Sequence, residues 1–339
     1  MKIIYMKALL IKGYGDIESN ISFEDIKEPT CGKKQILVEI YSAGVNPIDY
    51  KIIEGQLKAF QKLKFPAPIG FDVAGVVIEK GDEVNNFNIG DKVYSRVSGN
   101  EPGTFAEFIA IDCNLASHMP NNLSFNEASS LPLVALTTIQ SFEKAELKAN
   151  DKILIHAGSG GIGTFAIQYA KSKGAFVYTT TSTNNVEWVR ELGADVVIDY
   201  KKDNYLDIVK DIDVVYDTLG GKYTTDAFNI IKEGGKVISI AGDIDKETSI
   251  ELGLNTFVRF LLSLKRMKIT KLITKKSAYY KFILMNPSGS QLKDLKLLIE
   301  ENKIKAIIDK SFNFSESIKA LLYLKKGRAK GKIVIEIKK

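Results

Sequence analysis

The run Asn150–Lys171, written NDKILIHAGSGGIGTFAIQYAK, restricts the fold of this chain more than any other stretch. Its first part, Lys152–His156, is a short apolar run of β-branched character. Its last part, Thr164–Lys171, has the spacing of a helix. Between them lies the pattern G-x-G-x-x-G. A buried strand, a glycine turn and a helix start in this order form the context in which this pattern binds a dinucleotide.

Each glycine of the pattern has a physical role. Gly158 allows the tight turn, Gly160 lets the backbone approach a pyrophosphate, and Gly163 lets the helix pack closely on the strand. The amide N–H groups at the helix start can then hold the anion. Glycines at such a turn can also serve packing alone. We assign to the cofactor the whole turn, namely Gly158, Ser159, Gly160, Gly161, Ile162 and Gly163.

Strand and helix signals alternate from residue 150 to about 241, which predicts parallel strands joined by crossover helices in a doubly wound Rossmann sheet. The expected strands are Lys152–His156, Ala175–Thr180, Val196–Asp199, Val214–Asp217 and Lys236–Ile240, and the expected helices are 162–172, 185–192 and 223–232.

The rest of the chain has a different pattern. Residues 6–41 and 66–94 alternate short apolar runs with turn residues, which predicts a β-rich part. Ser124 with Glu127 forms a capping box for a helix that continues through Glu143. Residues 243–278 are basic and partly helical, and a last strand is expected over Tyr279–Met285. The C-terminal tail carries two helices, 291–302 and 315–326, and a closing strand.

Composition indicates an ordinary globular protein. A chain of 339 residues suggests about two domains. Two cysteines without metal or disulfide spacing favour a reducing compartment. We recognise no signal peptide and no apolar stretch of the roughly 20 residues that span a bilayer, so we expect a cytoplasmic protein with no membrane partner. The net charge of +6 and the lysine clusters 265–276 and 325–339 could attract an anionic surface or nucleic acid. A solvated surface explains them as well, and no nucleic-acid motif accompanies them.

Three segments together resemble one family. The residues Asn150, Asp151, Leu154, Gly158 to Gly161, Gly163, Gln168 and Lys171, the segment AGVNPID at 43–49 and the segment LPLVALTT at 131–138 match motifs of the zinc-independent quinone oxidoreductase and ζ-crystallin group of the medium-chain dehydrogenase/reductase superfamily. This resemblance implies an α/β fold with a GroES-like β-rich catalytic domain, 1–125 and 286–339, and a Rossmann NADP-binding domain, 126–285. It also implies a homodimer, which we expect to form through the strand near Tyr279–Met285.

The resemblance further implies that Asn46 and Thr137 lie beside the nicotinamide. A bare turn and a helix-interior threonine are the alternatives. The zinc-dependent branch has Gly-His-Glu where this chain has Gly70-Phe71-Asp72, and a ligating cysteine where it has Asn46. A catalytic zinc needs three protein ligands, and His118, His156 and the two cysteines show no suitable clustering. We therefore expect no metal.

The end of the second Rossmann strand indicates NADPH. An acidic residue there would select NAD, but the sequence reads Thr181-Ser182-Thr183, whose hydroxyls can bind a 2′-phosphate. The resemblance adds Tyr200 and a basic residue near the C-terminus, for which we choose Lys330. Many relatives have a lysine where this chain has Asn184, so Lys201, Arg328 or Lys330 must supply the charge.

A reductase reaction follows from these assignments. Without a metal to activate an alcohol, hydride addition to a quinone or an α,β-unsaturated carbonyl is the simpler chemistry, since orientation and a donor for the oxygen suffice. Asn46 and Lys51 are the candidate donors, and Tyr50 or water could deliver the proton. Asp49 could simply cap a helix. The alternatives are a one-electron quinone reductase and a non-catalytic protein that binds NADPH or RNA.

Overall fold

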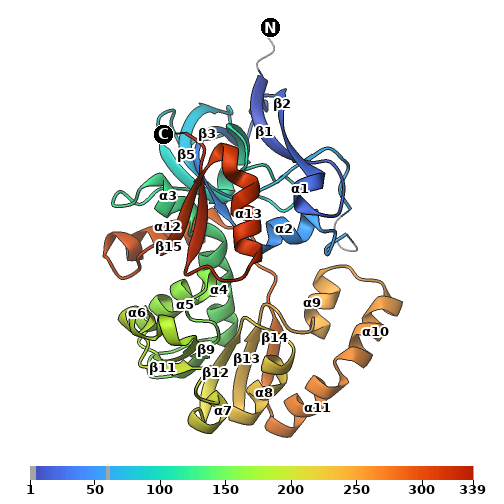
Figure 1. The fold of residues 1–339 in the computed structure, drawn as a ribbon, viewed down its shortest axis with the longest axis vertical. Coiled ribbons are helices and arrows are strands. Elements are labelled where there is room, and N and C mark those ends of the chain that lie inside the picture. Colours follow the sequence, from blue (N-terminus) through green and yellow to red (C-terminus); the bar gives the residue numbers. More distant parts are fainter. Residues whose placement is uncertain (1–4, 59–61, 339) are drawn as a thin grey trace. The chain divides into compact units, whose positions relative to one another are not determined.

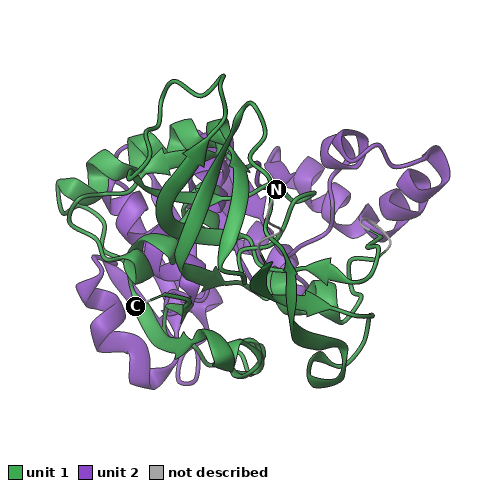
Figure 2. Cartoon of the chain, turned by 90° about the horizontal axis from the view of Figure 1, so that it is seen from above, with its two compact units in different colours: residues 1–136, 287–339 green, residues 137–286 purple. Residues whose placement is uncertain are grey.

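The computed structural model describes residues 5–58 and 62–338. The chain folds into two compact units, which Figure 2 shows in different colours. Unit 1 comprises residues 1–136 and 287–339, and unit 2 comprises residues 137–286.

Unit 2 is built on a parallel sheet of six strands in the order β11-β10-β9-β12-β13-β14. This order is that of the doubly wound dinucleotide-binding fold, in which the chain starts in the centre and winds to each edge in turn. The strands are β9 (Lys152–Ile155), β10 (Phe176–Thr181), β11 (Val196–Asp199), β12 (Ile212–Asp217), β13 (Ile231–Ser239) and β14 (Tyr279–Phe282). The central strand β9 is apolar and fully buried from Ile153 to Ile155, as a strand covered on both faces must be.

Helices follow the strands of unit 2 (Figure 1). They are α5 (Gly161–Ser172), η2 (Thr183–Asn185), α6 (Val186–Glu191), α7 (Tyr205–Ile208), α8 (Lys222–Ile230), α9 (Lys246–Glu251), α10 (Thr256–Lys265) and α11 (Met267–Lys276). Helix α4 (Pro132–Ala145) includes the boundary between the units. Apolar side chains from β12, β13, α8 and α11 form the core on one side of the sheet.

Unit 1 is β-rich and contains a sheet of seven strands and a sheet of three. Its strands are β1 (Tyr5–Ile11), β2 (Ile21–Lys27), β3 (Gln35–Val45), β4 (Ala67–Pro68), β5 (Asp72–Lys80), β6 (Lys92–Arg96), β7 (Phe108–Asp112), β8 (Ala116–His118), β15 (Ile308–Asn313) and β16 (Lys332–Glu336). Its helices are α1 (Ile17–Asn20), α2 (Pro47–Ile53), η1 (Cys113–Leu115), α3 (Phe125–Ser129), α12 (Gly289–Glu300), η3 (Phe314–Glu316) and α13 (Ser317–Lys325).

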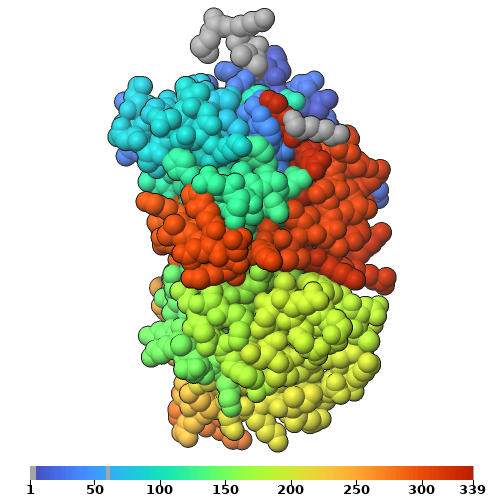
Figure 3. Space-filling view, turned by 90° about the vertical axis from the view of Figure 1, so that its left-hand side faces the viewer, coloured from blue at the N-terminus to red at the C-terminus, as the bar shows by residue number. Residues whose placement is uncertain are grey.

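The C-terminal segment completes unit 1. Strand β16 pairs with β3 across almost 300 residues of sequence, and β15 extends the sheet beyond it. Figure 3 shows the C-terminal segment against residues near position 120. There the Tyr94 hydroxyl donates to the Leu292 carbonyl at 2.6 Å, and Asn122 Nδ2 donates to the Ile299 carbonyl at 2.9 Å. The tail therefore belongs to the fold of unit 1.

The expected fold class is confirmed, and several element assignments change. Residues 6–41 contain the short helix α1, the basic stretch 243–278 is made of three helices, and β15 was not expected. The last Rossmann strand ends at Phe282 rather than Met285, because the chain then leaves the sheet. The expected helix 223–232 ends at Ile230, where β13 begins. The domain limits at 125/126 and 285/286 remain a prediction.

Candidate functional site

The glycine turn connects β9 to α5. The Gly158 N–H donates to the Thr180 carbonyl at 2.9 Å, so the turn is held against the end of β10. A Cβ atom at Gly158 would overlap Thr179 Oγ1, and one at Gly163 would overlap the Ala157 carbonyl. Packing within the protein therefore requires glycine at 158 and 163.

Gly160 has a different environment. Its φ of −80° and ψ of 170° suit any residue, and a Cβ atom there would meet only the Ala157 carbonyl, at 3.3 Å. This contact is tight and would need a shift of a few tenths of an ångström, so packing within the protein constrains Gly160 much less than Gly158 and Gly163. A ligand lying against the backbone would give this position a further reason to be glycine. Helix α5 begins at Gly161, and the N–H groups of a first helical turn lack acceptors within the helix. This corner fits the pyrophosphate of a dinucleotide.

The end of β10 lies beside the turn. Thr181 is buried, and its Oγ1 is without a hydrogen-bond partner among the described residues. Asn185 Nδ2 donates to Ser182 Oγ at 3.0 Å and to Ser159 Oγ at 3.2 Å, which ties the strand end to the turn. Trp188 Nε1 in turn donates to Asn185 Oδ1 at 3.2 Å. Sequence reasoning missed Asn185, although its neighbour Asn184 was considered.

The end of β11 adds a carboxylate beside these hydroxyls. Asp199 pairs in register with Thr181, and its Oδ1 accepts the Lys201 N–H at 3.1 Å. Lys202 Nζ lies 3.7 Å from the same carboxylate. Tyr200 follows with its side chain 56% exposed. No acidic residue stands at the end of β10, but the neighbouring strand β11 ends in Asp199. Lys201 and Lys202 follow this carboxylate closely in the sequence.

In unit 1, Asn46 is the last residue before α2 and is 1% exposed. Its N–H donates to Asp49 Oδ2 at 2.7 Å, and its Nδ2 donates to Asp72 Oδ2 at 2.9 Å. Its Oδ1 accepts a hydrogen bond from Lys332 Nζ. Both ends of the Asn46 amide are therefore occupied by groups of the same unit.

Lys332 connects β16 to this cluster. Its Nζ also donates to the Val45 carbonyl at 3.2 Å and lies 3.7 Å from Asp72 Oδ2. Asp72 Oδ1 accepts the Leu133 N–H at 3.0 Å. The side chain of Lys332 is 6% exposed and that of Asp72 is fully buried. Burial lowers the pKa of Lys332, an effect that the carboxylates of Asp72 and Asp49 oppose.

Two further charges complete what we call the buried polar cluster, which consists of Asn46, Asp49, Asp72, Arg96 and Lys332. Arg96 is 5% exposed, and its guanidinium carbon lies 4.4 Å from the centre of the Phe71 ring. Burial raises the pKa of Asp49 to about 7. The cluster holds two carboxyl and two basic groups, which balance formally. Within residues 5–58 and 62–338, no three or more His, Cys, Asp or Glu side chains are grouped to hold a metal ion.

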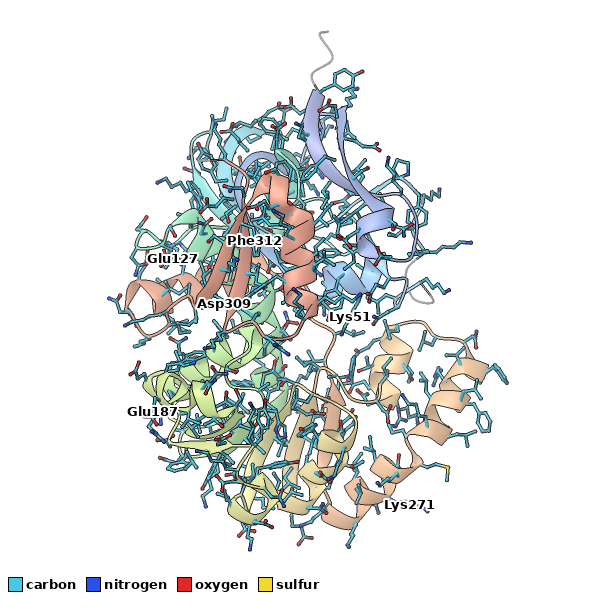
Figure 4. The ribbon with its side chains drawn as sticks, viewed as in Figure 1. Lys51, Glu127, Glu187, Lys271, Asp309 and Phe312 are labelled. Atoms are coloured by element: carbon cyan, nitrogen blue, oxygen red, sulfur yellow. The ribbon has the colours of Figure 1, made fainter. Side chains whose placement is uncertain are left out.

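Helix α2 presents the remaining candidates of unit 1. Tyr50 is half-buried against the core, and burial raises its pKa. Lys51, labelled in Figure 4, is exposed. Lys330 is exposed just before β16. Thr137 belongs to unit 2, is 7% exposed and accepts the Ser141 hydroxyl at its carbonyl at 2.6 Å.

Sequence reasoning anticipated that Asp49 could cap a helix, and Asp49 does so by accepting the Asn46 N–H, but it missed the other partners of Asn46. Arg96 was not singled out, and Lys332 was hidden in the strand run Gly331–Ile337. A lysine within an apolar strand is a usable signal, since a buried ammonium needs partners. Its partner could not be read from the sequence, because β16 joins β3 only in the folded unit.

Two family models and several known proteins match this chain. Residues 32–121 match the alcohol dehydrogenase GroES-like domain, and residues 192–335 match the family described as zinc-binding dehydrogenase. The chain is 34% identical to 2-methylene-furan-3-one reductase of Solanum lycopersicum, over 97% of this chain and 79% of that protein. It is 33% identical to the chloroplastic NADPH-dependent alkenal/one oxidoreductase of Arabidopsis thaliana, with the same coverage.

A solved structure agrees with these matches. The quinone oxidoreductase of Coxiella burnetii superimposes with a TM-score of 0.86 at 31% identity, covering 99% of this chain and 100% of that one. The family resemblance found in the glycine turn and in the segments at 43–49 and 131–138 is therefore confirmed. The chain belongs to the quinone oxidoreductase group of the medium-chain dehydrogenase/reductase superfamily.

Proposed function

We propose that this protein is an NADPH-dependent reductase of quinones or α,β-unsaturated carbonyls. The observation that carries the proposal is Gly160, a glycine that packing within the protein constrains only weakly, at the start of a helix that can hold an anion. Relatives that match 97% of the chain are named as an NADPH-dependent alkenal/one oxidoreductase and a 2-methylene-furan-3-one reductase. These names favour hydride reduction over one-electron chemistry and over a non-catalytic role in NADPH or RNA binding.

In this proposal each unit has its own task. When bound, NADPH supplies hydride from C4 of its nicotinamide. The turn Gly158–Gly163 and Ser182 hold the pyrophosphate and the adenosine side, with Thr181, Tyr200 and Lys330 as further contacts. In unit 2, Thr137 is the candidate contact for the nicotinamide.

The structure refines the proposed role of Asn46. Because both ends of its amide are bonded within the buried polar cluster, we assign Asn46 to positioning of α2 rather than to donation to the substrate. Lys51 is then the candidate donor for the developing oxyanion. Tyr50, or a water molecule, is the candidate proton donor.

Replacing Asn46 with Ala tests this role. Loss of two hydrogen bonds to charged groups should lower the free energy of unfolding by about 2–4 kcal/mol. Turnover should fall roughly 10- to 100-fold as α2 shifts, while NADPH affinity stays within about threefold. Ser42→Ala is the matched control, because Ser42 is equally buried on β3 but bonds only Ser129 Oγ. If both variants keep normal turnover in their folded fraction, Asn46 has no part in catalysis.

Cofactor preference is a second expected result. NADPH should bind at least tenfold more tightly than NADH, a difference of about 1.4 kcal/mol. Charge-assisted hydrogen bonds to a phosphate are strong enough for this, and the neighbouring lysines offset Asp199. Titration of both cofactors against the wild type and against Lys201→Met, Arg328→Met and Lys330→Met identifies the cation. The variant that removes it should weaken NADPH binding and leave NADH binding unchanged. Equal affinities in the wild type would contradict the assignment.

A third expected result concerns zinc. At the positions of zinc ligands in the zinc-dependent branch, this chain has Asn46, bonded to an ammonium, and Phe71, covered by a guanidinium. The two carboxyl groups of the cluster, Asp49 and Asp72, already face these two cations, and the described residues group no three His, Cys, Asp or Glu side chains that could hold a metal ion. The purified protein should therefore carry less than one tenth of a zinc ion per chain and keep its activity with strong chelators. One zinc per chain by elemental analysis, with activity lost on its removal, contradicts this.

The acceptor is found by an NADPH-oxidation screen across quinones, short enals, cyclic enones and alkenals. Reduction of at least one class without a detectable semiquinone supports the proposal. If the protein binds NADPH but reduces none of these acceptors, the result contradicts the proposal and favours a non-catalytic NADPH-binding protein. A homodimer through β14, the edge strand of the sheet in unit 2, and a cytoplasmic location remain predictions.

A further inference from the structure

Three helices of unit 2, α9, α10 and α11, project beyond the edge strand β14 as an arm (Figure 1). We call residues 246–276 the helical arm. None of the ten residues of α10, all of them described by the structure, is buried. Four large apolar side chains of this helix are exposed instead, by 69%, 56%, 48% and 47% for Phe257, Phe260, Leu261 and Leu264.

These four side chains form one stripe. Positions i, i+3, i+4 and i+7 lie on the same face of an α-helix. Met267, which follows directly, is 50% exposed, and Ile250 in α9 is 51% exposed. An exposed apolar face of this kind marks an interaction surface, since scattered single apolar residues are normal but a contiguous stripe is not.

The same arm is strongly cationic. Residues 252–278 contain seven basic residues and no acidic one. On α11, Lys268, Lys271 and Lys275 are exposed at positions i, i+3 and i+7, while Ile269 is buried and packs with Leu272 in the core of unit 2. Figure 4, in which Lys271 is labelled, shows the side chains of α10 and α11 projecting from the arm.

Part of this charge is not neutralised by the protein. Lys265 pairs with Asp243 at 2.7 Å, and Lys276 donates to the Ile231 carbonyl at 3.2 Å. In the described part of the chain, the lysines at 268, 271 and 275 and the arginine at 259 form no ion pair. The arm thus presents an apolar stripe together with free positive charge.

We propose that the helical arm binds the surface of an anionic lipid bilayer, with the α10 stripe between the headgroups and the α11 lysines over the lipid phosphates. An amphipathic helix with large apolar residues on one face and lysines nearby is the type of element that lies in this interface. No helix among the described residues is long and apolar enough to cross a membrane. The expectation of no membrane partner rested on the lack of a spanning segment and on the explanation of the lysine cluster 265–276 as a solvated surface, and this proposal would revise it.

The charge distribution selects this occupant over two others. A second copy that used the arm as a symmetric interface would bring two cationic segments near each other, and residues 252–278 have no acidic residue to balance them. A nucleic acid would use the cations but leave the four apolar side chains of α10 in water. An anionic surface with an apolar interior satisfies both features.

Vesicle cosedimentation tests the proposal on the full chain. With vesicles of phosphatidylcholine containing 30 mol% phosphatidylglycerol, the bound fraction should be at least tenfold that with phosphatidylcholine alone, and it should fall severalfold between 50 and 500 mM salt. Equal binding to both vesicles, or none to either, overturns the proposal. A single-stranded oligonucleotide at the same phosphate concentration should not displace the protein, and displacement would overturn it in favour of nucleic acid.

Two variants separate the contributions of the arm. Phe257→Ser with Phe260→Ser, and Lys268→Glu with Lys271→Glu, should each lower vesicle binding at least tenfold. Lys148→Glu with Lys210→Glu is the control, because both lysines are exposed in unit 2 outside the arm, and it should bind like the wild type. NADPH oxidation with a water-soluble acceptor should be unchanged in all three. That assay separates failure of this proposal from failure of the proposed function. If light scattering shows a dimer that the serine variant dissociates, the face binds a second copy and the proposal is wrong.

Discussion

Gly160→Val is expected to weaken NADPH binding at least 100-fold while the apoprotein keeps its fold. The backbone of Gly160 is extended, with φ of −80° and ψ of 170°, a conformation that valine favours. The nearest protein atom to an added Cβ is the Ala157 carbonyl at 3.3 Å. This contact is tight and valine is a poor N-cap residue, so the free energy of unfolding should fall by about 1–2 kcal/mol, which leaves the fold intact. The branched side chain would instead occupy the space that the pyrophosphate needs.

Two other glycines serve as controls for this experiment. Gly99→Val places the same side chain in open space in unit 1 and should leave NADPH affinity unchanged. Gly163→Ala should instead lower the free energy of unfolding, since its Cβ would overlap the Ala157 carbonyl and destabilise the turn itself. Titration with NADPH gives the cofactor affinity of each variant, and urea denaturation gives its free energy of unfolding. A Gly160→Val protein that binds NADPH normally would remove the glycine turn from the proposed site.

The Rossmann unit could be predicted from the sequence because its signals are local. The strand at 196–199 was predicted to the residue, and the one at 152–156 was one residue too long. Parallel strands covered on both faces are continuous apolar runs, and glycines mark where the helices end. The capping box of Ser124 with Glu127 was confirmed for the same reason, since Ser124 Oγ accepts the Glu127 N–H at 3.3 Å.

Features that depend on distant residues could not be predicted. Helix α10 exposes its apolar residues, whereas α11 buries Ile269 and exposes most of its lysines, so the basic stretch showed only a partly helical pattern. Strand β15 pairs with β16, and its exposed lysine and serine are adjacent in sequence. The alternation of apolar and polar residues that predicts a strand is therefore missing. In the site, the sequence identified Asn46 but not the ammonium of Lys332 bonded to it, because 286 residues separate them.

Lys332→Met should destabilise the protein by about 3–5 kcal/mol, the usual cost of leaving a buried charge without its partner. Methionine matches the length of the lysine side chain, so little packing is lost. Removal of the ammonium leaves Arg96 alone against the carboxyl groups of Asp49 and Asp72, which are fully buried. The control is Lys338→Met, in the same unit. Lys338 Nζ bonds Glu39 at 2.6 Å on the surface, and loss of such an exposed pair costs about 1 kcal/mol or less.

The pH dependence of this loss shows whether buried charge is its cause. Burial raises the pKa of Asp49 to about 7 and also raises that of Asp72. A carboxyl whose pKa is higher in the folded state binds protons more tightly there, so its folded state is most favoured at low pH and loses stability as pH rises from about 4 toward 7. Without the ammonium both pKa values rise further. The stability difference between wild type and Lys332→Met, measured by urea denaturation, should therefore be larger at pH 8 than at pH 5. Adding Asp72→Asn to Lys332→Met should recover part of the stability and flatten its pH dependence. A loss that is equal at both pH values and is not recovered by Asp72→Asn would mean that Lys332 acts through packing alone.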